Sequence, residues 1–419
     1  MKKSIGKNKA TREFKPDVET FAKIKVVGIG GSGGSAINRM VENKIRGVEF
    51  IAINTDAQAL NRSDADKRIQ IGIDTTKGLG AGMDPDVGAR SAEENLEEIE
   101  KSLEGADMVF ITCGLGGGTG TGAAPIIADI ARRNNSLTVA VVTKPFSFEG
   151  SQRKMISERG FNELESRVDT IITIPNDRIL NIIDRKTSVL DSFKIADEIL
   201  HQGIQGISEI ITIPGEVNVD FADVKRIMSD AGSALMGIGR ASGEDRAKRA
   251  AKEAIDSPLL DVSIAGAKGI LFTITGGEDL TMYEINEIAE IITSSADGGA
   301  SIIFGTVIDK SMSGDVKVMV VATGFESFDS QKKDVAKMNS AYKQNEYISR
   351  MNHSIKDITD VSEDIDEIEF EEEKDNADTT INDTSFDDYD NDIKLNNDSE
   401  FLEQNSEYDI PAFLRKKMK

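Results

Sequence analysis

The sequence has few of the residues that support redox, disulfide or metal chemistry. It holds one cysteine, Cys113, two histidines, His201 and His353, and no tryptophan among 419 residues. A lone cysteine excludes an intramolecular disulfide and is typical of a protein kept in a reducing compartment. With so few ligands, a zinc site of the Cys/His type is not expected, and neither is a Cys–His nucleophile pair.

Long apolar runs are also missing. No stretch reaches the roughly 18 consecutive apolar residues that indicate a membrane-spanning helix. The N-terminus, MKKSIGKNKA, is basic, but no apolar segment of the kind found in secretory signals follows it. We therefore expect a cytoplasmic protein.

Basic residues are outnumbered. The chain has 50 Lys and Arg against 73 Asp and Glu, a formal charge of −23, which argues against a surface that binds nucleic acid broadly. The excess is uneven, because residues 361–405 hold 18 acidic residues and two lysines, a net charge of −16. Such a segment buries too little apolar surface to offset its ordering entropy, so we expect a disordered acidic tail.

The chain does have an alternating pattern of predicted strands and helices. Short apolar runs at 24–27, 50–53, 108–112, 137–142 and 170–174 are separated by helical segments, a pattern typical of a parallel sheet covered on both faces. An apolar stripe of helical period then predicts a helix of roughly 37 Å over 188–212. A second α/β unit follows, with strands expected at 269–275, 302–307 and 316–323.

Two glycine-rich loops follow strands of the first unit. In the first, Gly28, Gly30 and Gly33 match the dinucleotide-binding spacing G-x-G-x-x-G. The second, residues 114–122, has six glycines in nine residues and no Gly-Lys-Ser/Thr, so it is not a Walker A loop. Two such loops at strand ends of one sheet predict two walls of one anion site, formed by free N–H groups at helix N-termini.

The run GGGTGTG at 116–122 resembles the phosphate-binding signature of the tubulin/FtsZ family of GTPases. Further motifs agree, in order, with the bacterial FtsZ branch of that family: IKVVG at 24–28, NTD at 54–56, VTKPF at 142–146, FEG at 148–150, IPND at 174–177, NVDFAD at 218–223 and GIG at 237–239. The resemblance covers about residues 23–325. It implies a GTP-hydrolysing, self-polymerising cytoskeletal protein that forms the bacterial division ring.

The resemblance also implies an organisation of the chain. We expect a Rossmann-like parallel-sheet GTPase domain joined by a long central helix to a second, smaller α/β domain, followed by the acidic tail. The expected segments are a flexible arm (1–21), the GTP-binding domain (22–187), the central helix (188–213), the C-terminal domain (214–326), the acidic linker (327–405) and a docking peptide (406–419).

For the site, the resemblance implies GTP or GDP, with Mg²⁺ held through the phosphates rather than by dedicated side chains. Asn176 and Asp197 match residues that read the guanine edge, and Phe193 one that stacks on the base, although by itself Phe193 could belong to the apolar stripe and Asp197 could be a solvated charge. The residues that match phosphate and ribose contacts are Gly31, Ser32, Gly33, Gly34, Ser35, Gly118, Thr119, Gly120, Glu149 and Arg153.

The segment with Asn218, Asp220 and Asp223 has two interpretations. Locally, either carboxylate could be a helix N-cap. In the family that the chain resembles, this loop meets the GTP of the next subunit, where its carboxylates polarise and position the attacking water. Hydrolysis in trans would make the main partner a second copy of the chain, in a head-to-tail contact that builds a filament because it does not close.

The last residues resemble the family's docking motif for membrane tethers and regulatory division proteins. Its residues would be Ile410, Pro411, Phe413, Leu414 and Arg415, although an ordinary disordered end is the plain alternative. Docking through this peptide would place the protein at the division site beneath the inner membrane, with only indirect membrane contact and no nucleic acid as partner.

Two other functions remain open on the sequence. The glycine spacing of the first loop is also that of an NAD(P)-dependent oxidoreductase, but this leaves the second loop and the NVDFAD segment unexplained. A GTP-binding scaffold that does not hydrolyse GTP is the second alternative, and the presence of Asp220 and Asp223 argues against it.

Overall fold

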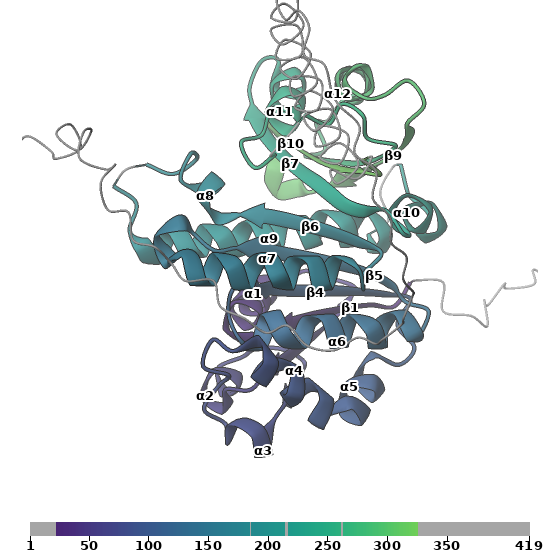
Figure 1. Ribbon diagram of the computed structural model, residues 1–419. Coiled ribbons are helices and arrows are strands. Elements are labelled where there is room, and N and C mark those ends of the chain that lie inside the picture. Colours follow the sequence, from purple (N-terminus) through teal and green to yellow (C-terminus); the bar gives the residue numbers. More distant parts are fainter. Residues whose placement is uncertain (1–21, 185, 214–216, 261–262, 326–419) are drawn as a thin grey trace, which may run out of the picture. The chain divides into compact units, whose positions relative to one another are not determined.

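The computed structural model describes residues 22–184, 186–213, 217–260 and 263–325 (Figure 1). All of them lie in the first of two compact units, residues 1–343. The predicted N-terminal arm, the acidic linker and the docking peptide with Ile410, Pro411, Phe413, Leu414 and Arg415 lie outside the described residues.

The described strands form one sheet in the order β3-β2-β1-β4-β5-β6-β7-β10-β8-β9. In its first part every neighbouring pair is parallel. The apolar runs of the sequence form these strands because both faces are covered. Their bounds are β1 (Ile24–Ile29), β2 (Val48–Asn54), β3 (Lys67–Gln70), β4 (Met108–Gly114), β5 (Leu137–Lys144) and β6 (Thr170–Pro175).

The second part of the sheet is mixed. Its strands are β7 (Gly232–Ser242), β8 (Gly269–Gly276), β9 (Ser301–Ile308) and β10 (Asp315–Thr323). β10 runs antiparallel to both β7 and β8, while β8 and β9 are parallel. The start of β7 pairs with β6 in parallel, so the two parts share one hydrogen-bonded sheet. The predicted fold class, a large parallel-sheet domain with a second α/β domain, is confirmed.

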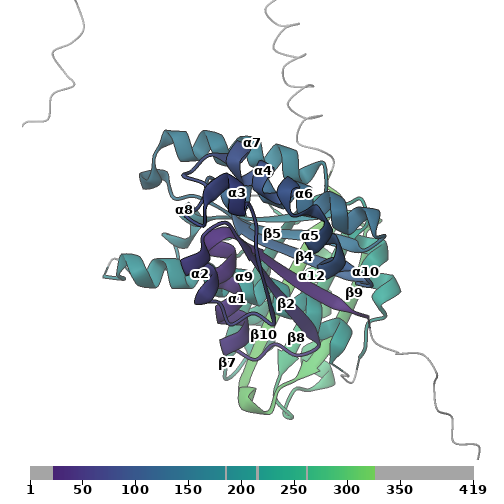
Figure 2. The same ribbon diagram turned by 90° about the horizontal axis from the view of Figure 1, so that it is seen from below.

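Helices cover both faces of the parallel part (Figures 1 and 2). One apolar core includes residues of α1 (Gly30–Glu42), α9 (Val189–Thr212) and α10 (Phe221–Met228). A second core, on the other face, includes residues of α4 (Pro85–Glu94), α5 (Leu96–Leu103), α6 (Thr119–Arg133) and α7 (Ser151–Glu165). α11 (Arg246–Ile255) and α12 (Met282–Ser295) pack on β8 and β10 in a third core.

The remaining described elements are short. They lie in connections between the strands and longer helices and include the segments that surround the site below. They are α2 (Ala57–Asn61), α3 (Ile73–Thr76), η1 (Ser147–Glu149), α8 (Asn176–Ile179) and η2 (Lys310–Met312). Among the described residues, no helix combines the length and the apolar character that crossing a bilayer demands.

The expected central helix is α9. Ser188 is its N-cap and accepts a hydrogen bond from the N–H of Asp191 at 3.1 Å, which satisfies one of the free donors at the helix start. Its small residues approach the second part of the sheet closely. The carbonyl of Gly206 accepts a hydrogen bond from the Thr273 hydroxyl of β8 at 3.2 Å, so α9 connects both parts of the sheet.

Strand β7 is absent from the sequence-based prediction, because glycines interrupt its apolar pattern. These glycines serve close packing against α11. A Cβ on Gly239 would lie 2.1 Å from the carbonyl oxygen of Ala250, and one on Gly237 would lie 2.0 Å from that of Ala254. Glycine is required here because the neighbouring atoms are helix backbone, which cannot move aside as a side chain can.

We expect Gly239→Ala to lower the free energy of unfolding by roughly 1–3 kcal/mol, since overpacking against backbone forces the helix away from the sheet. Gly298→Ala is the matched control, because an added Cβ there meets nothing within 4 Å. Urea unfolding of the two variants measures the difference. Equal stability of Gly239→Ala and the wild type would contradict the close packing of β7 and α11.

Candidate functional site

The carboxyl ends of the central parallel strands open onto a cavity of about 500 Å³. β1 lies between β2 and β4. The connection after β1 leads to β2 and the connection after β4 leads to β5, in opposite directions along the sheet. In open α/β sheets, ligands bind at such a point. Ten of the predicted site residues line the cavity: Gly31, Ser32, Gly118, Thr119, Gly120, Glu149, Arg153, Asn176, Phe193 and Asp197.

The two glycine loops form adjoining walls of this cavity. The Ser32 hydroxyl accepts a hydrogen bond from the N–H of Gly114 at 2.6 Å, which ties the first loop to the end of β4. Behind them, the hydroxyls of Thr55 and Thr119 share a buried hydrogen bond of 2.6 Å. Neither α1 nor α6 has a side-chain cap at its start. Two uncapped helix N-termini at one cavity are suited to a phosphate chain.

Three predicted phosphate contacts lie elsewhere. Gly33 is buried and does not line the cavity. A Cβ there would lie 2.5 Å from the carbonyl oxygen of Thr112, so Gly33 lets α1 pack against the sheet. Gly34 and Ser35 line an adjoining cavity of about 330 Å³, which the main one meets at Gly30 and Gly31. Contact of these three with phosphate stays a prediction.

Arg153 is the basic side chain among the lining residues. Its guanidinium pairs with the carboxylate of Glu149, one helical turn earlier. That carboxylate also accepts a hydrogen bond from the N–H of Phe146 at 3.0 Å. The pair is therefore held at the cavity wall, with the guanidinium partly exposed and able to contact a phosphate or ribose oxygen.

The far wall is formed by α9 and the start of α8. Burial raises the pKa of the Asp197 carboxyl to about 7, and Arg39 partly offsets this. Asn176 is 6% exposed, and its side-chain oxygen has no hydrogen-bond partner among the described residues. A guanine fits these groups, because its N1–H and N2–H₂ donors would satisfy both the amide oxygen and the carboxylate.

Phe193 lies beside these polar groups. Its ring is 40% exposed and lies edge-on to that of Phe146, with 5.5 Å between the ring centroids. Since Phe193 lines the cavity and is not a buried core residue of the apolar stripe, the geometry suits a stacking contact with a base.

Sequence reasoning missed several lining residues. The loop between α3 and α4 contributes Gly80, Ala81, Gly82 and Met83, and the second glycine loop also contributes Gly117. The signal was present, because glycines alternate at positions 78, 80 and 82. Side chains from two quoted motifs line the cavity as well, Asn54, Asp56, Thr143 and Pro145.

The predicted catalytic residues are not at the cavity of their own subunit. Asn218, Asp220 and Asp223 are exposed, and none lines the cavity. Asp220 is the N-cap of α10, where its carboxylate accepts a hydrogen bond from the N–H of Ala222 at 3.0 Å. The local N-cap interpretation is therefore correct for Asp220, while Asp223 lies exposed in the first turn of α10.

Helix α10 and helix α8 lie at opposite ends of the parallel strands (Figures 1 and 2), and Asn176 at the start of α8 lines the cavity. Its last carbonyl, on Met228, accepts a hydrogen bond from the Thr170 hydroxyl at the start of β6. Asn176 follows the other end of β6. Six residues of strand, at about 3.3 Å each, separate the two edges by roughly 20 Å.

No group of three or more His, Cys, Asp or Glu side chains within the described ranges is arranged to hold a metal ion. Asp56, the N-cap of α2, is one of the carboxylates that line the cavity. Carboxylate and phosphate oxygens together are the ligands that Mg²⁺ prefers, so the donor set fits a metal carried by a nucleotide.

Two family models match the chain. Residues 23–184 match the GTPase domain of the tubulin/FtsZ family, and residues 232–326 match the C-terminal domain of the FtsZ family. An FtsZ structure from M. jannaschii, solved as an empty dimer, is 47% identical, with a TM-score of 0.71, and the match covers 73% of this chain and 89% of that one. The chain belongs to the tubulin/FtsZ family.

Other solved structures agree. A point mutant of the M. jannaschii FtsZ is also 47% identical, with a TM-score of 0.72 and coverage of 74% of this chain and 92% of that one. CetZ1 from Haloferax volcanii, a GDP-bound monomer, is 22% identical, with a TM-score of 0.63 and coverage of 73% and 95%; this likeness shows the fold alone.

Family membership decides between the nucleotide classes. The members are GTPases that bind GTP and GDP and belong to the cytoskeletal and cell-division proteins. The resemblance read from the glycine loops is therefore confirmed, and the alternative of an NAD(P)-dependent oxidoreductase is set aside.

We expect GDP affinity to fall as the pH drops below about 7, roughly tenfold per unit. The reason is that guanine donors require the ionised Asp197, whose pKa is raised to about 7 by burial. Below that value the carboxyl must lose a proton before both of its oxygens can accept hydrogen bonds from the guanine. Calorimetric titration with GDP between pH 5.5 and 8 measures the slope.

Asp197→Asn is the control for this titration. The variant should bind GDP weakly and lose the part of the pH dependence that the carboxyl causes, while the part caused by the nucleotide's own phosphates remains. Equal slopes for the wild type and the variant would show that Asp197 does not read the base.

Proposed function

We infer that this chain is a GTP-hydrolysing protein that polymerises head to tail and forms a division ring, as the resemblance implied for bacteria. GTP would bind in the cavity of one subunit and be hydrolysed with residues 218–223, the aspartate loop, of the next. The same proposal includes a cytoplasmic location at the division site and, through residues 406–419, contact with membrane tethers and regulatory division proteins.

One observation carries this proposal. Asp220 and Asp223 are exposed at the opposite edge of the sheet from a cavity suited to GTP. Within one subunit, roughly 20 Å of strand keeps them from the phosphates. In a head-to-tail pair the two edges face each other, so the site becomes complete only at the contact between copies.

The reaction itself needs few protein groups. Water attacks the γ-phosphorus, the bond from that phosphorus to the β,γ-bridging oxygen breaks, and GDP and phosphate leave. The N–H groups of the two glycine loops and Arg153 would hold the phosphates, and Asp223 with Asp220 and Asn218 of the neighbouring subunit would position and polarise the water. Mg²⁺, when bound with the nucleotide, offsets phosphate charge.

The relatives support self-association. The M. jannaschii FtsZ that is 47% identical to this chain was solved as a dimer.

The domain limits that we propose are a GTP-binding domain over 22–187, a central helix over 188–213 and a polymerisation domain over 214–326, with residues 1–21 as an arm and 327–405 as a linker.

We expect Asp223→Ala to abolish most GTP turnover while nucleotide binding and assembly survive, because the variant keeps the cavity and the contact surface and loses the group that positions water. Phosphate release and light scattering with GTP, GDP and a non-hydrolysable analogue measure the two effects. Glu244→Ala, which removes another exposed carboxylate, should behave as the wild type.

The concentration dependence of turnover separates the proposal from its rivals. Hydrolysis in trans predicts that activity per subunit rises with protein concentration. Constant activity per subunit in isolated monomers would contradict it, as would loss of GTP binding in a folded Asp223→Ala variant. GTP binding without any turnover would favour the non-hydrolysing scaffold.

A further inference from the structure

The strands at the two edges of the sheet differ in how they are protected from pairing. β3 lies at one edge and begins with exposed Lys67 and Arg68. β9 lies at the other edge, reads SIIFGTVI over residues 301–308, and has neither a charged residue nor a proline. Charges, lysine above all, and proline are what keep natural edge strands from pairing with another chain. β9 therefore has the composition of an edge that pairs.

The hydrogen bonds of β9 show which of its main-chain groups point outward. The N–H of Ser301 donates at 2.8 Å to the carbonyl of Lys268, directly before β8. Main-chain groups alternate in direction along a strand, so the odd-numbered residues face β8 and the even-numbered residues face the free edge. Thr306 agrees with this alternation, because its N–H donates away from β8, to the carbonyl of Val217 at 3.1 Å.

The open part of this edge is short. The N–H and C=O groups of Ile302 and Phe304 point outward, and within the described ranges no hydrogen bond to them is formed. Further along the strand, the outward N–H of Thr306 is already taken by Val217. The edge thus accepts an extended segment of its own chain at one end and leaves two residues for a second strand.

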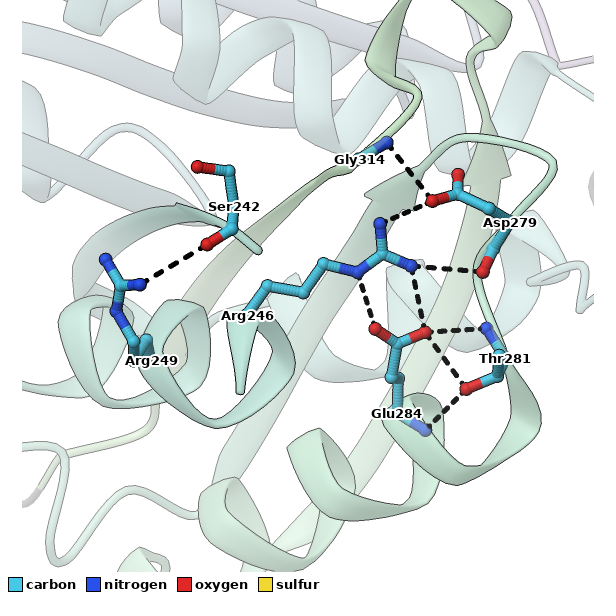
Figure 3. A network of polar contacts seen from close by, with 7 residues as sticks. All are labelled: Ser242, Arg246, Arg249, Asp279, Thr281, Glu284 and Gly314. Carbon is cyan, nitrogen blue, oxygen red and sulfur yellow. Dashed lines mark hydrogen bonds and ion pairs between the residues drawn. The ribbon is translucent and has the colours of Figure 1, made fainter. Parts of the chain in front are cut away.

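A polar network holds the strands behind this edge in place (Figure 3). Arg246 of α11 donates to the carboxylate of Asp279, shortly after β8, at 2.6 Å and to both oxygens of Glu284 at 2.5 and 3.1 Å. Asp279 also accepts a hydrogen bond of 3.1 Å from the N–H of Gly314, which directly precedes β10. An edge that is ordered in advance loses little conformational entropy when it pairs.

A second copy of the chain fits the edge because the open groups are self-complementary. In an antiparallel pair with a two-fold axis at Ile303, Ile302 of each copy lies opposite Phe304 of the other. Each of these two residue pairs exchanges two N–H···O bonds, so all the open groups are used. The charge of −23 opposes contact between copies. β9 is a neutral part of the chain, so two copies can meet along it without like charges opposite each other.

The side chains of the edge suit the same arrangement. The two Ile303 side chains would meet across the axis as a non-hydrogen-bonded pair, in which side chains lie closest. On the other face, Ile302 would lie against Phe304 of the other copy, an aromatic and β-branched pair of the kind that stabilises sheets. Phe304 is already held by stacking on Phe272 of β8, with 5.2 Å between the ring centroids.

We propose that two copies of the chain pair through β9 in an antiparallel two-fold dimer, which continues the sheet of one subunit into the other. Each surface contacts its own equivalent, so this contact closes at two copies, whereas a head-to-tail contact extends. Val217 directly precedes the aspartate loop and bonds to β9 at Thr306, so the second copy would lie beside that loop. The dimer would therefore compete with filament growth, a consequence that rests on the proposed trans hydrolysis.

A single cysteine at the two-fold axis tests the pairing in the full chain. Ile303→Cys should form a disulfide-linked dimer with GDP and a mild oxidant, because only a two-fold contact brings the same residue of both copies together. Ile182→Cys is the matched control. Ile182 is 49% exposed, so random collision would link it readily. Cys113 is buried and burial raises its pKa to about 12, so it will not compete.

A charge at the open edge gives a second measurement. Ile302→Lys should weaken the GDP-bound dimer about tenfold or more in sedimentation velocity, the size of loss typical of an interface hot spot. Ile308→Lys adds the same charge at the end of β9, outside the proposed pair, and should dimerise as the wild type. Ile302→Pro should act as Ile302→Lys does, because it removes an outward N–H and proline is tolerated at a strand edge.

Assembly with GTP tests the competition. Ile302→Lys should lower the protein concentration at which light scattering begins, because the competing dimer is lost. An unchanged concentration would overturn the competition with the filament. The pairing itself is overturned if the wild type is monomeric with GDP at the concentrations used for assembly, if Ile302→Lys dimerises as the wild type, or if Ile303→Cys links no better than Ile182→Cys. Turnover that is independent of protein concentration would refute the proposed function, while the measurements with GDP would still decide the pairing.

Discussion

The length of a short parallel strand is the constraint on which the rest of this structure depends. β6 begins at Thr170 beside α10 and ends at Pro175, directly before Asn176 on the cavity side, so the sheet separates the nucleotide cavity from the aspartate loop. Neither Asp220 nor Asp223 lines the cavity. In the trans hydrolysis proposed above, nucleotide binding would depend on the single subunit and hydrolysis on the contact between subunits.

The close packing of helices against the sheet fixes the position of the cavity relative to the aspartate loop. Gly203 and Gly206 of α9 would clash with Met236 and Met319 if either carried a Cβ. These methionines come from β7 and β10, so α9 packs directly on the second part of the sheet. Since α9 also carries Phe193 and Asp197, the helix that forms the far wall of the cavity is also the one that contacts the second part of the sheet. A displacement at one end of α9 would be transmitted to its other end.

Much of this arrangement could be predicted from the sequence, because its signals are local. The glycine loops, the strand before each and the helix beginning at Ser188 follow from short patterns that need no tertiary information. Ten of the thirteen nucleotide contacts predicted through motif resemblance line the cavity for the same reason. Strand β7 could not be predicted, because its glycines at 237 and 239 are explained only by the helix backbone of α11 that they meet.

The environments of the side chains could not be predicted from the sequence either. The spacing of Phe193 and Asp197 places them on one helix face, but it does not reveal that Asp197 is buried enough to raise its pKa to about 7. Likewise, Gly33 and Gly31 look alike in the sequence, and only the packing of α1 shows that one is structural and the other lines the cavity. The pairing of Arg246 with Glu284 joins residues 38 positions apart, which no local pattern encodes.

The strongly acidic composition is compatible with binding a polyanion because the glycine loops offer backbone donors to it rather than charged side chains. At the glycine loops, the groups offered to phosphates are backbone N–H donors at two uncapped helix starts, joined by Arg153. The buried carboxyl of Asp197 is on α9, at the wall formed with α8. Burial makes its charge costly until donors meet it, so a guanine bound as proposed would both supply those donors and allow the carboxyl to ionise. An adenine offers no such N1–H donor, and the site would have to leave a buried carboxylate unpaired or protonated, which is a physical basis for selecting guanine.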